Sequence, residues 1–306
     1  MRLRFVFIAA LLPSLAAAAL VPDVRAAIAR QDFAGAEKRV RDFHASAGAT
    51  PEMILGLSWL GRGHLAAGNL TEAERFAAET RELALAELKK RPLDAEKDLP
   101  LALGASIEVQ AHVLDKRGER DQGVAFLRSE LKTWFNTSIR TRIQKNLHLL
   151  SLEGKPAPPL EVQSHLGPKP TQVSAYRGQT LLLFFWAHWC GDCKQQGPVL
   201  ARLQREYGPR GLAILGPTQR YGYVAGGQDA TPAEETPYID RVRRQFYGAL
   251  DTMPVPLGEE TFKNYGVSTT PTLVLVDSTG IVRLYHPGKM TYEDLRARIE
   301  SVLGAS

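Results

Sequence analysis

The sequence is poor in cysteine, with only two among its 306 residues. One disulfide at most can form, which excludes the dense framework of staples that holds many small secreted proteins together. Neither sign of charge is in large excess, because 38 basic residues against 33 acidic ones leave a formal net charge of +5. A balance this close to neutral gives no reason to expect nucleic acid as a partner.

Long hydrophobic runs are missing beyond the N-terminus. Residues 1–19 contain two arginines, an apolar run from Phe5 to Leu12, then Pro13 and a string of small residues. This layout predicts a signal peptide, cleaved near residue 18 or 19, and export of the mature protein to a bacterial periplasm. The alternative is an uncleaved N-terminal anchor facing the periplasm, although the run is shorter than the roughly 20 residues that span a bilayer.

Residues 20–153 show apolar residues at three-and-four spacing, which predicts an all-helical domain. The segment WLGRGHLAAGNLTEAERFAAET places Trp59, Gly61 and Ala73 where a tetratricopeptide repeat has its packing residues, and two other segments resemble the second half of that repeat. The region therefore resembles a degenerate array of such helical hairpins. An array of this kind either binds a protein partner or serves as a packing shell for the next domain, and both readings stay open.

A second domain is predicted over residues 154–306. It begins with GKPAPPLEV, a stretch too rich in proline to continue a helix. Apolar runs typical of strands then alternate with amphipathic segments typical of helices, which predicts an α/β sandwich. The predicted strands are 181–186, 212–215, 272–277 and 281–286, and the predicted helices are 194–207, 236–247, 259–265 and 291–303.

Both cysteines lie in the stretch WAHWCGDCK, where a buried strand leads into a helix. This position puts Cys190 at a helix N-terminus, whose backbone N–H groups and dipole stabilise a thiolate, so Cys190 is the predicted nucleophile. Cys193 is close enough to resolve a mixed disulfide formed at Cys190. A disulfide that closes so short a loop adds little to the stability of the fold. No metal site is predicted, since the nearest further ligands are His188 and His286 and no second cysteine pair exists.

These residues resemble the thioredoxin superfamily. The resemblance rests on WCGDCK after an apolar strand, on Pro198, and on Thr270-Pro271 within YGVSTTPT. The leader, the proline-rich start and the long segment 217–247 make the chain similar to the exported TlpA-like thiol-disulfide oxidoreductases. The fold that this implies is a thioredoxin-like α/β sandwich preceded by the all-α, repeat-like helical domain.

The resemblance also implies roles for individual residues. Cys190 would attack a partner disulfide and Cys193 would release the product, with no cofactor beyond this redox-active pair. Pro271 would be cis and would place the backbone of Thr270 beside the sulfurs to bind an extended substrate segment. Trp189 would offer a flat contact surface for the substrate or, equally, would shield the disulfide. The implied partners are exported proteins with cysteines or disulfides, and a membrane-linked thiol donor.

The sequence departs from the family at one position. Thioredoxins have a buried aspartate in the strand, six residues before the first cysteine, that relays a proton to the second thiol, whereas this chain has Phe184 there. Water or another acid must then relay the proton, or deprotonation of Cys193 is slow. Glu259 and Glu260 are the candidate acids. Asp192, between the cysteines, should disfavour a thiolate at either of them, which predicts a reducing couple.

The function predicted from these observations is a periplasmic thiol-disulfide oxidoreductase that reduces other exported proteins. An oxidase or isomerase is the alternative within the same chemistry. A further alternative, of a different class, is a helical-repeat scaffold with a non-catalytic thioredoxin-like domain. The loop from Tyr221 to Gly227 is interpreted as a surface excursion rather than a lid over the thiols.

Overall fold

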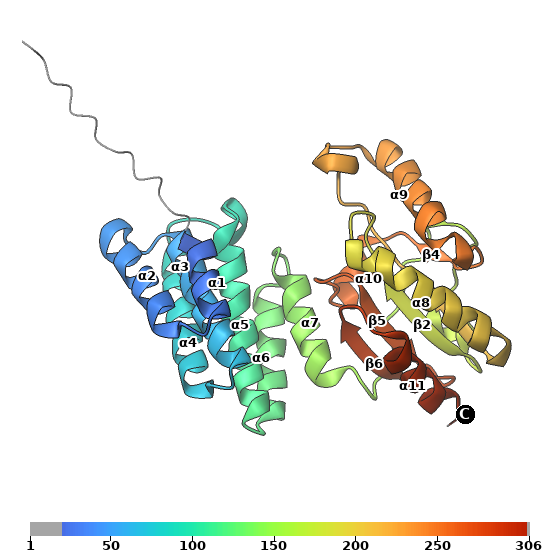
Figure 1. The fold of residues 1–306 in the computed structure, drawn as a ribbon, viewed down its shortest axis with the longest axis horizontal. Helices are drawn as coiled ribbons and strands as arrows, with labels where there is room; N and C mark the ends of the chain where they lie inside the picture. Colours follow the sequence, from blue (N-terminus) through green and yellow to red (C-terminus); the bar gives the residue numbers. More distant parts are fainter. Residues whose placement is uncertain (1–19, 305–306) are drawn as a thin grey trace, which may run out of the picture. The chain divides into compact units, whose positions relative to one another are not determined.

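The computed structural model describes residues 20–304, so the predicted signal peptide lies outside the described residues (Figure 1). The chain divides into two compact units, one ending at Ser106 and one running from Ile107 to Ser306. The helix α5 (Asp98–Lys116) runs through this division. The predicted boundary at residues 153 and 154 therefore falls inside the second unit, for a reason given below. Among the described helices, none is long and apolar enough to span a bilayer.

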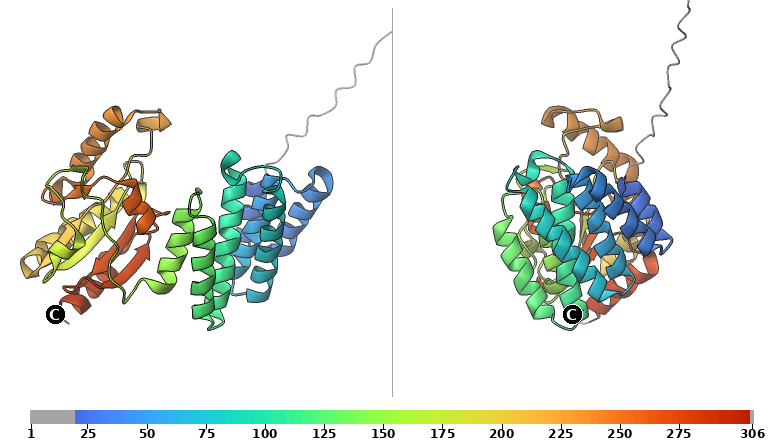
Figure 2. Two further views of the ribbon diagram at one scale, coloured as in Figure 1. Left: turned by 180° about the vertical axis from the view of Figure 1, so that it is seen from behind. Right: turned by 90° about the vertical axis from the view of Figure 1, so that its left-hand side faces the viewer.

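The first unit consists of helical hairpins, as Figures 1 and 2 show in blue and cyan. Its complete helices are α1 (Leu20–Ala29), α2 (Phe33–Ala47), α3 (Pro51–Ala66) and α4 (Leu70–Glu87). The start of α3 follows from its sequence: the Thr50 side chain accepts a hydrogen bond from Met53 N, and Pro51 fits the first turn because it needs no hydrogen-bond partner there. The helical character expected for this half is confirmed, and its relation to tetratricopeptide repeats remains a prediction.

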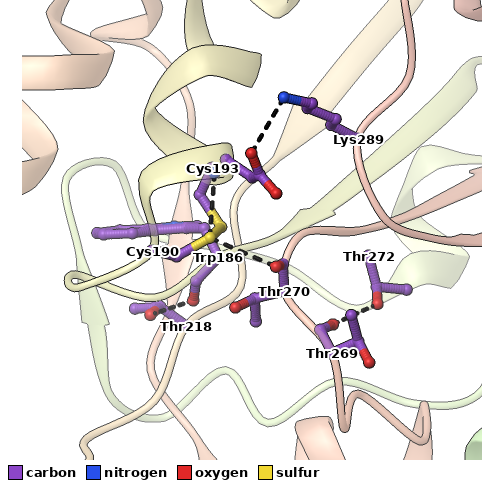
Figure 3. The surroundings of a disulfide bond; sticks show 9 residues. Trp186, Cys190, Cys193, Thr218, Thr269, Thr270, Thr272 and Lys289 are labelled. Carbon is purple, nitrogen blue, oxygen red and sulfur yellow. Dashed lines mark hydrogen bonds and ion pairs between the residues drawn. A yellow bond between two sulfur atoms is a disulfide. The ribbon is translucent and has the colours of Figure 1, made fainter. Parts of the chain in front are cut away.

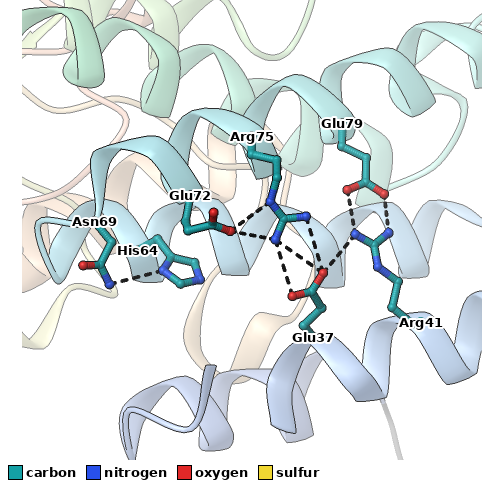
Figure 4. A network of polar contacts seen from close by, with 7 residues as sticks. All are labelled: Glu37, Arg41, His64, Asn69, Glu72, Arg75 and Glu79. Carbon is teal, nitrogen blue, oxygen red and sulfur yellow. Dashed lines mark hydrogen bonds and ion pairs between the residues drawn. The ribbon is translucent and has the colours of Figure 1, made fainter. Parts of the chain in front are cut away.

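A network of ion pairs joins α2 to α4 (Figure 4). Arg41 binds Glu79 and Glu37, and Arg75 binds Glu37 and Glu72. The hydrogen bond from Arg41 lowers the pKa of Glu79 below its ordinary value. These groups are partly exposed, so we expect the network to fix the packing of the helices more than to add stability.

The second unit contains a four-stranded mixed sheet in the order β3-β2-β5-β6. Strand β2 is parallel to β3 and antiparallel to β5, and β5 is antiparallel to β6. A short second sheet pairs β1 with β4. The helices after α5 are α6 (Arg120–Thr133), α7 (Arg140–Ser151), α8 (Gly191–Tyr207), α9 (Pro232–Tyr247), α10 (Glu259–Asn264) and α11 (Tyr292–Leu303), and the strands are β1 (His165–Leu166), β2 (Thr180–Phe185), β3 (Leu212–Leu215), β4 (Val255–Pro256), β5 (Thr272–Val276) and β6 (Val282–Pro287). The α/β thioredoxin-like fold predicted for this region is confirmed.

Strand β2 is the centre of the unit and is buried on both faces. Leu182 and Phe184 point into a core shared with α8, α9 and α11, whereas Leu183 and Phe185 point into a core shared with α10 and the end of α7. This alternation is why the strand reads as an uninterrupted apolar run. The sheet thus lies between two layers of helix, with the end of β2 leading into α8 (Figure 1).

Helix α7 packs directly on the thioredoxin-like fold. His148 Nε2 is 2.8 Å from the carbonyl oxygen of Asn264, and its ring meets Tyr285 of β6 edge to face. At Gly266, where φ is +63°, an added Cβ would lie 2.4 Å from Lys145 N, so only glycine allows α7 to approach this closely. This close contact explains why α7 belongs to the second unit although it precedes the proline-rich stretch.

We expect the protein to lose stability as the pH falls below 6.5, the ordinary histidine pKa. Burial lowers the pKa of His148 in the folded chain, so the unfolded chain binds its proton at a higher pH than the folded chain does. Stability from this residue is complete above pH 6.5 and is lost below it, by at most about 1.4 kcal/mol per pH unit. Urea denaturation at pH 7.5 and 5.5 measures this loss. His148→Gln, which keeps a donor for Asn264 but does not titrate, should reduce the difference between the two pH values, and an unchanged difference would contradict the assignment.

Candidate active site

The two cysteines form a disulfide at the N-terminus of α8 (Figure 3). Cys190 is the residue that caps the helix, and its Sγ accepts a hydrogen bond of 3.0 Å from Cys193 N. The helix begins at Gly191, earlier than the predicted Lys194, so the motif itself forms the first turn. Cys193 is fully buried and Cys190 is nearly so. An N–H group that points at Sγ in the disulfide is placed to stabilise negative charge on Cys190 after reduction.

A second element, the loop before β5, also contacts the disulfide. The Thr270-Pro271 peptide bond is cis, and the Thr270 carbonyl oxygen lies 3.4 Å from Cys190 Sγ (Figure 3). Thr272 Oγ1 donates a 2.7 Å hydrogen bond to the carbonyl oxygen of Thr269, which holds the turn. The structure therefore brings Thr270, Pro271 and Cys190 together, and the substrate-binding role of the loop remains a prediction.

The end of β2 is anchored by a tryptophan in the core. Trp186 Nε1 donates to the carbonyl oxygen of Gly216, and Thr218 Oγ1 donates to the carbonyl oxygen of Trp186, each at 2.8 Å. Both side chains are buried, so these bonds are shielded from water and fix the direction in which the chain leaves the strand. The cysteine turn starts four residues after this anchor.

Trp189, next to Cys190, is on the surface. Its side chain is 49% exposed, and its ring meets Tyr221 edge to face, with 5.5 Å between the ring centroids. An indole that is half exposed beside a buried disulfide can contact a substrate and shield the sulfur on one side. Both roles predicted for Trp189 therefore remain open.

The charge of Asp192 is compensated in part. Its carboxylate lies 3.1 Å from Lys289 Nζ, and both side chains are about half exposed. Solvent weakens a surface pair of this kind. The negative charge of Asp192 therefore still disfavours a thiolate at the cysteines. The effect is weaker than the sequence alone suggested, because Lys289 partly neutralises that charge.

Both candidates for the proton relay are engaged in ion pairs. The position of the family's aspartate is taken by Phe184, which is fully buried and packs edge-on against Tyr247. Glu260 binds Lys263 and Arg140, and the hydrogen bond from Lys263 lowers its pKa, which makes it a poorer proton carrier. Glu259 is exposed and pairs with Lys263 at 2.9 Å. A relay through Glu259 or Glu260 remains a prediction.

A buried hydrogen-bonded pair beside the active site was missed by sequence reasoning. His188 Nε2 lies 3.2 Å from Glu235 Oε1, and both side chains are 1% exposed. The Glu235 carboxylate also accepts hydrogen bonds from Tyr221 N at 2.6 Å and from Gly222 N at 2.9 Å. Burial lowers the pKa of His188, so the imidazole is neutral at pH 7 and Nε2 donates to the carboxylate.

Three tyrosine rings enclose His188: those of Tyr221, Tyr223 and Tyr238 each meet it edge to face. The interpretation of the loop from Tyr221 to Gly227 as a surface excursion therefore needs correction. Its first residues, Tyr221 and Tyr223, pack against His188, which lies two residues before Cys190. The available signals were the histidine two residues before Cys190 and the sequence Tyr-Gly-Tyr. Nothing in the sequence marked Glu235 as their partner.

A metal centre is not evident at the site. Within residues 20–304, no group of three or more His, Cys, Asp or Glu side chains is arranged to hold a metal ion. His188 is occupied by Glu235, and His286 lies on β6 opposite Leu273. The expectation of a site without metal or cofactor remains a prediction.

Comparisons with known proteins agree on the second unit. The family model described as Redoxin matches residues 152–303. The chain is 28% identical over 150 residues to the thioredoxin-like protein YneN of Bacillus subtilis. The alignment covers 48% of this chain and 79% of that protein. It is 29% identical over 141 residues to the thiol-disulfide oxidoreductase ResA of Geobacillus thermodenitrificans. That alignment covers 46% of this chain and 73% of ResA.

A solved structure gives a similar match. A putative thiol:disulfide interchange protein DsbE from Chlorobium tepidum is 26% identical and aligns with 50% of this chain and 98% of its own, with a TM-score of 0.40.

Proposed function

Residues 152–303 are a thioredoxin-superfamily domain of the TlpA-like type, and from this premise we propose that the chain works in the periplasm as a reductant of other exported proteins. The chain is a thioredoxin-like thiol-disulfide oxidoreductase, as its relatives are. The observation that carries the proposal is the Cys190–Cys193 disulfide at the start of α8, with Cys190 Sγ against the Thr270 carbonyl.

The proposed reaction has two steps. The Cys190 thiolate attacks a client disulfide, so one client sulfur leaves as a thiolate and takes up a proton while the other forms a mixed disulfide with Cys190. Cys193 then loses its proton and attacks Cys190 Sγ, which releases the second client thiol. The client gains two electrons and two protons, and the enzyme is left with the Cys190–Cys193 disulfide. A membrane-linked thiol donor reduces it again, and no other cofactor takes part.

One feature favours reduction over oxidation. Strong oxidants owe their potential to a highly stabilised thiolate in the reduced form. Here Asp192 lies between the cysteines and is only partly neutralised by Lys289, so the Cys190 thiolate gains less stabilisation. The periplasmic location is supported by the leader-like composition of residues 1–19.

The reduction potential of the Cys190–Cys193 pair tests this direction. Equilibration in glutathione or dithiothreitol buffers, followed by the fluorescence of Trp186 and Trp189, gives the value. We expect a result near about −270 mV, as for thioredoxin, whereas a value near about −120 mV would make the protein an oxidant of newly exported chains.

A further inference from the structure

A cleft of about 500 Å³ lies beside the disulfide. One side of it is formed by Trp189 and Tyr221, and another by the loop that contains Thr270. A further wall comes from outside the sequence range that matches the family, since Ser138 and Thr141 also line it. Thr141 belongs to α7, and Ser138 precedes that helix. The docking of α7 on the thioredoxin-like fold has therefore added a wall to the cleft next to the cysteines.

The charges on the α10 side of the cleft neutralise one another. Lys263 Nζ is 2.9 Å from Glu259 and 2.8 Å from Glu260, and Glu260 in turn is 3.3 Å from Arg140. A charged group that entered here would compete with these pairs and would lose its own hydration. Several other residues that line the cleft bear hydroxyl groups, which can form hydrogen bonds with uncharged polar groups. They are Ser138, Thr141, Ser268 and Thr269.

We infer that Ser138 and Thr141 select the client segment, which is an extended, uncharged polar stretch of protein next to the cysteine that Cys190 attacks. The inference rests on the proposed function and names the substrate chemistry of the same site. An extended segment is favoured because the loop at Thr270 places a backbone carbonyl beside Cys190 Sγ. A client with its sulfur at Cys190 and its chain along the cleft passes α10 and reaches Thr141.

The test compares a small disulfide with a peptide disulfide. The full chain is reduced and then mixed with oxidised glutathione or with a short synthetic peptide whose central cysteine is joined to glutathione. The peptide is made with Ser, Thr and Asn flanks, with Asp flanks and with Lys flanks. Acid quenching and mass spectrometry give the rate of each exchange, so the readout does not depend on fluorescence.

We expect Thr141→Trp to slow exchange with the neutral peptide by about tenfold, because the indole fills the cleft, while exchange with oxidised glutathione changes less than about twofold. Ser138→Trp, at an exposed position, is a second blocking variant. Thr133→Trp is the matched control, since Thr133 is exposed at the end of α6 and does not line the cleft. It should leave every rate unchanged. In the wild type, the neutral peptide should react about tenfold faster than either charged peptide, relative to their exchange with free glutathione.

Three results would overturn the inference: equal rates for wild type and both blocking variants, equal slowing of the peptide and glutathione reactions, or faster reaction of a charged peptide. Other results would contradict the proposed function itself. In that case the wild type itself reacts no faster with any disulfide than a free thiol does, or its reduction potential is that of an oxidant.

Discussion

Cys190→Ser should abolish disulfide exchange, with a loss of at least about three orders of magnitude, as when other catalytic nucleophiles are removed. Serine is not nucleophilic at neutral pH without an activating base. Cys193 cannot take over, because its side chain is 0% exposed whereas Cys190 is 3% exposed and faces the Thr270 loop. The rate at which the reduced protein cleaves a peptide disulfide measures the effect.

Cys193→Ser should have a different result. The first attack by Cys190 still takes place, but the mixed disulfide is no longer resolved from within the chain. Client proteins should therefore accumulate in covalent complexes that dithiothreitol releases. The variant with both cysteines replaced is the control, and it should capture none of them covalently. If the same partners co-purified with this double variant, the helical half would hold them without redox chemistry, as the scaffold alternative predicts.

Glu235→Ala should destabilise the oxidised protein by about 3 kcal/mol, because each buried donor left without its acceptor costs about 1–3 kcal/mol. The substitution removes the acceptor of three hydrogen bonds, from His188, Tyr221 N and Gly222 N. Because both side chains are 1% exposed, water does not replace the lost acceptor without a rearrangement of the loop. Urea denaturation at pH 7.5 gives the change in the free energy of unfolding.

Two variants of α9 serve as controls for this loss. Glu235→Gln keeps the shape and one oxygen, so it should cost clearly less than alanine. Glu234→Ala alters the neighbouring residue, an exposed glutamate that completes the capping box with Thr231, and should have a much smaller effect. If Glu235→Ala were as stable as Glu234→Ala, the pair with His188 would not fasten the loop to the cysteine turn.

The elements of the second unit were predictable because their apolar patterns are strong. Strand β3 has the predicted limits, and β2, β5, β6 and α11 differ from theirs by about one residue. The start of α8 was placed too late, since Gly191 and Asp192 are weak helix formers and only the cap at Cys190 shows that the helix includes them. Patterns within a segment thus indicated the elements, and hydrogen bonds at their ends decided the limits.

The cysteines and the loop at Thr270 were also found from the sequence, because short motifs mark them. The pair of His188 and Glu235 was not, since its members are far apart in the chain and each alone looks like an ordinary polar residue. The same holds for Ser138 and Thr141, which reach the cleft only because α7 packs beside α10. Contacts of this kind depend on tertiary structure and leave no local pattern.

The close approach of Lys145 to Gly266 limits which substitutions this unit tolerates. The match to the Redoxin family model begins at Leu152, whereas the compact unit begins at Ile107. A residue with a Cβ at position 266 would require α7 to shift, so this helix and the thioredoxin-like fold form one packed module.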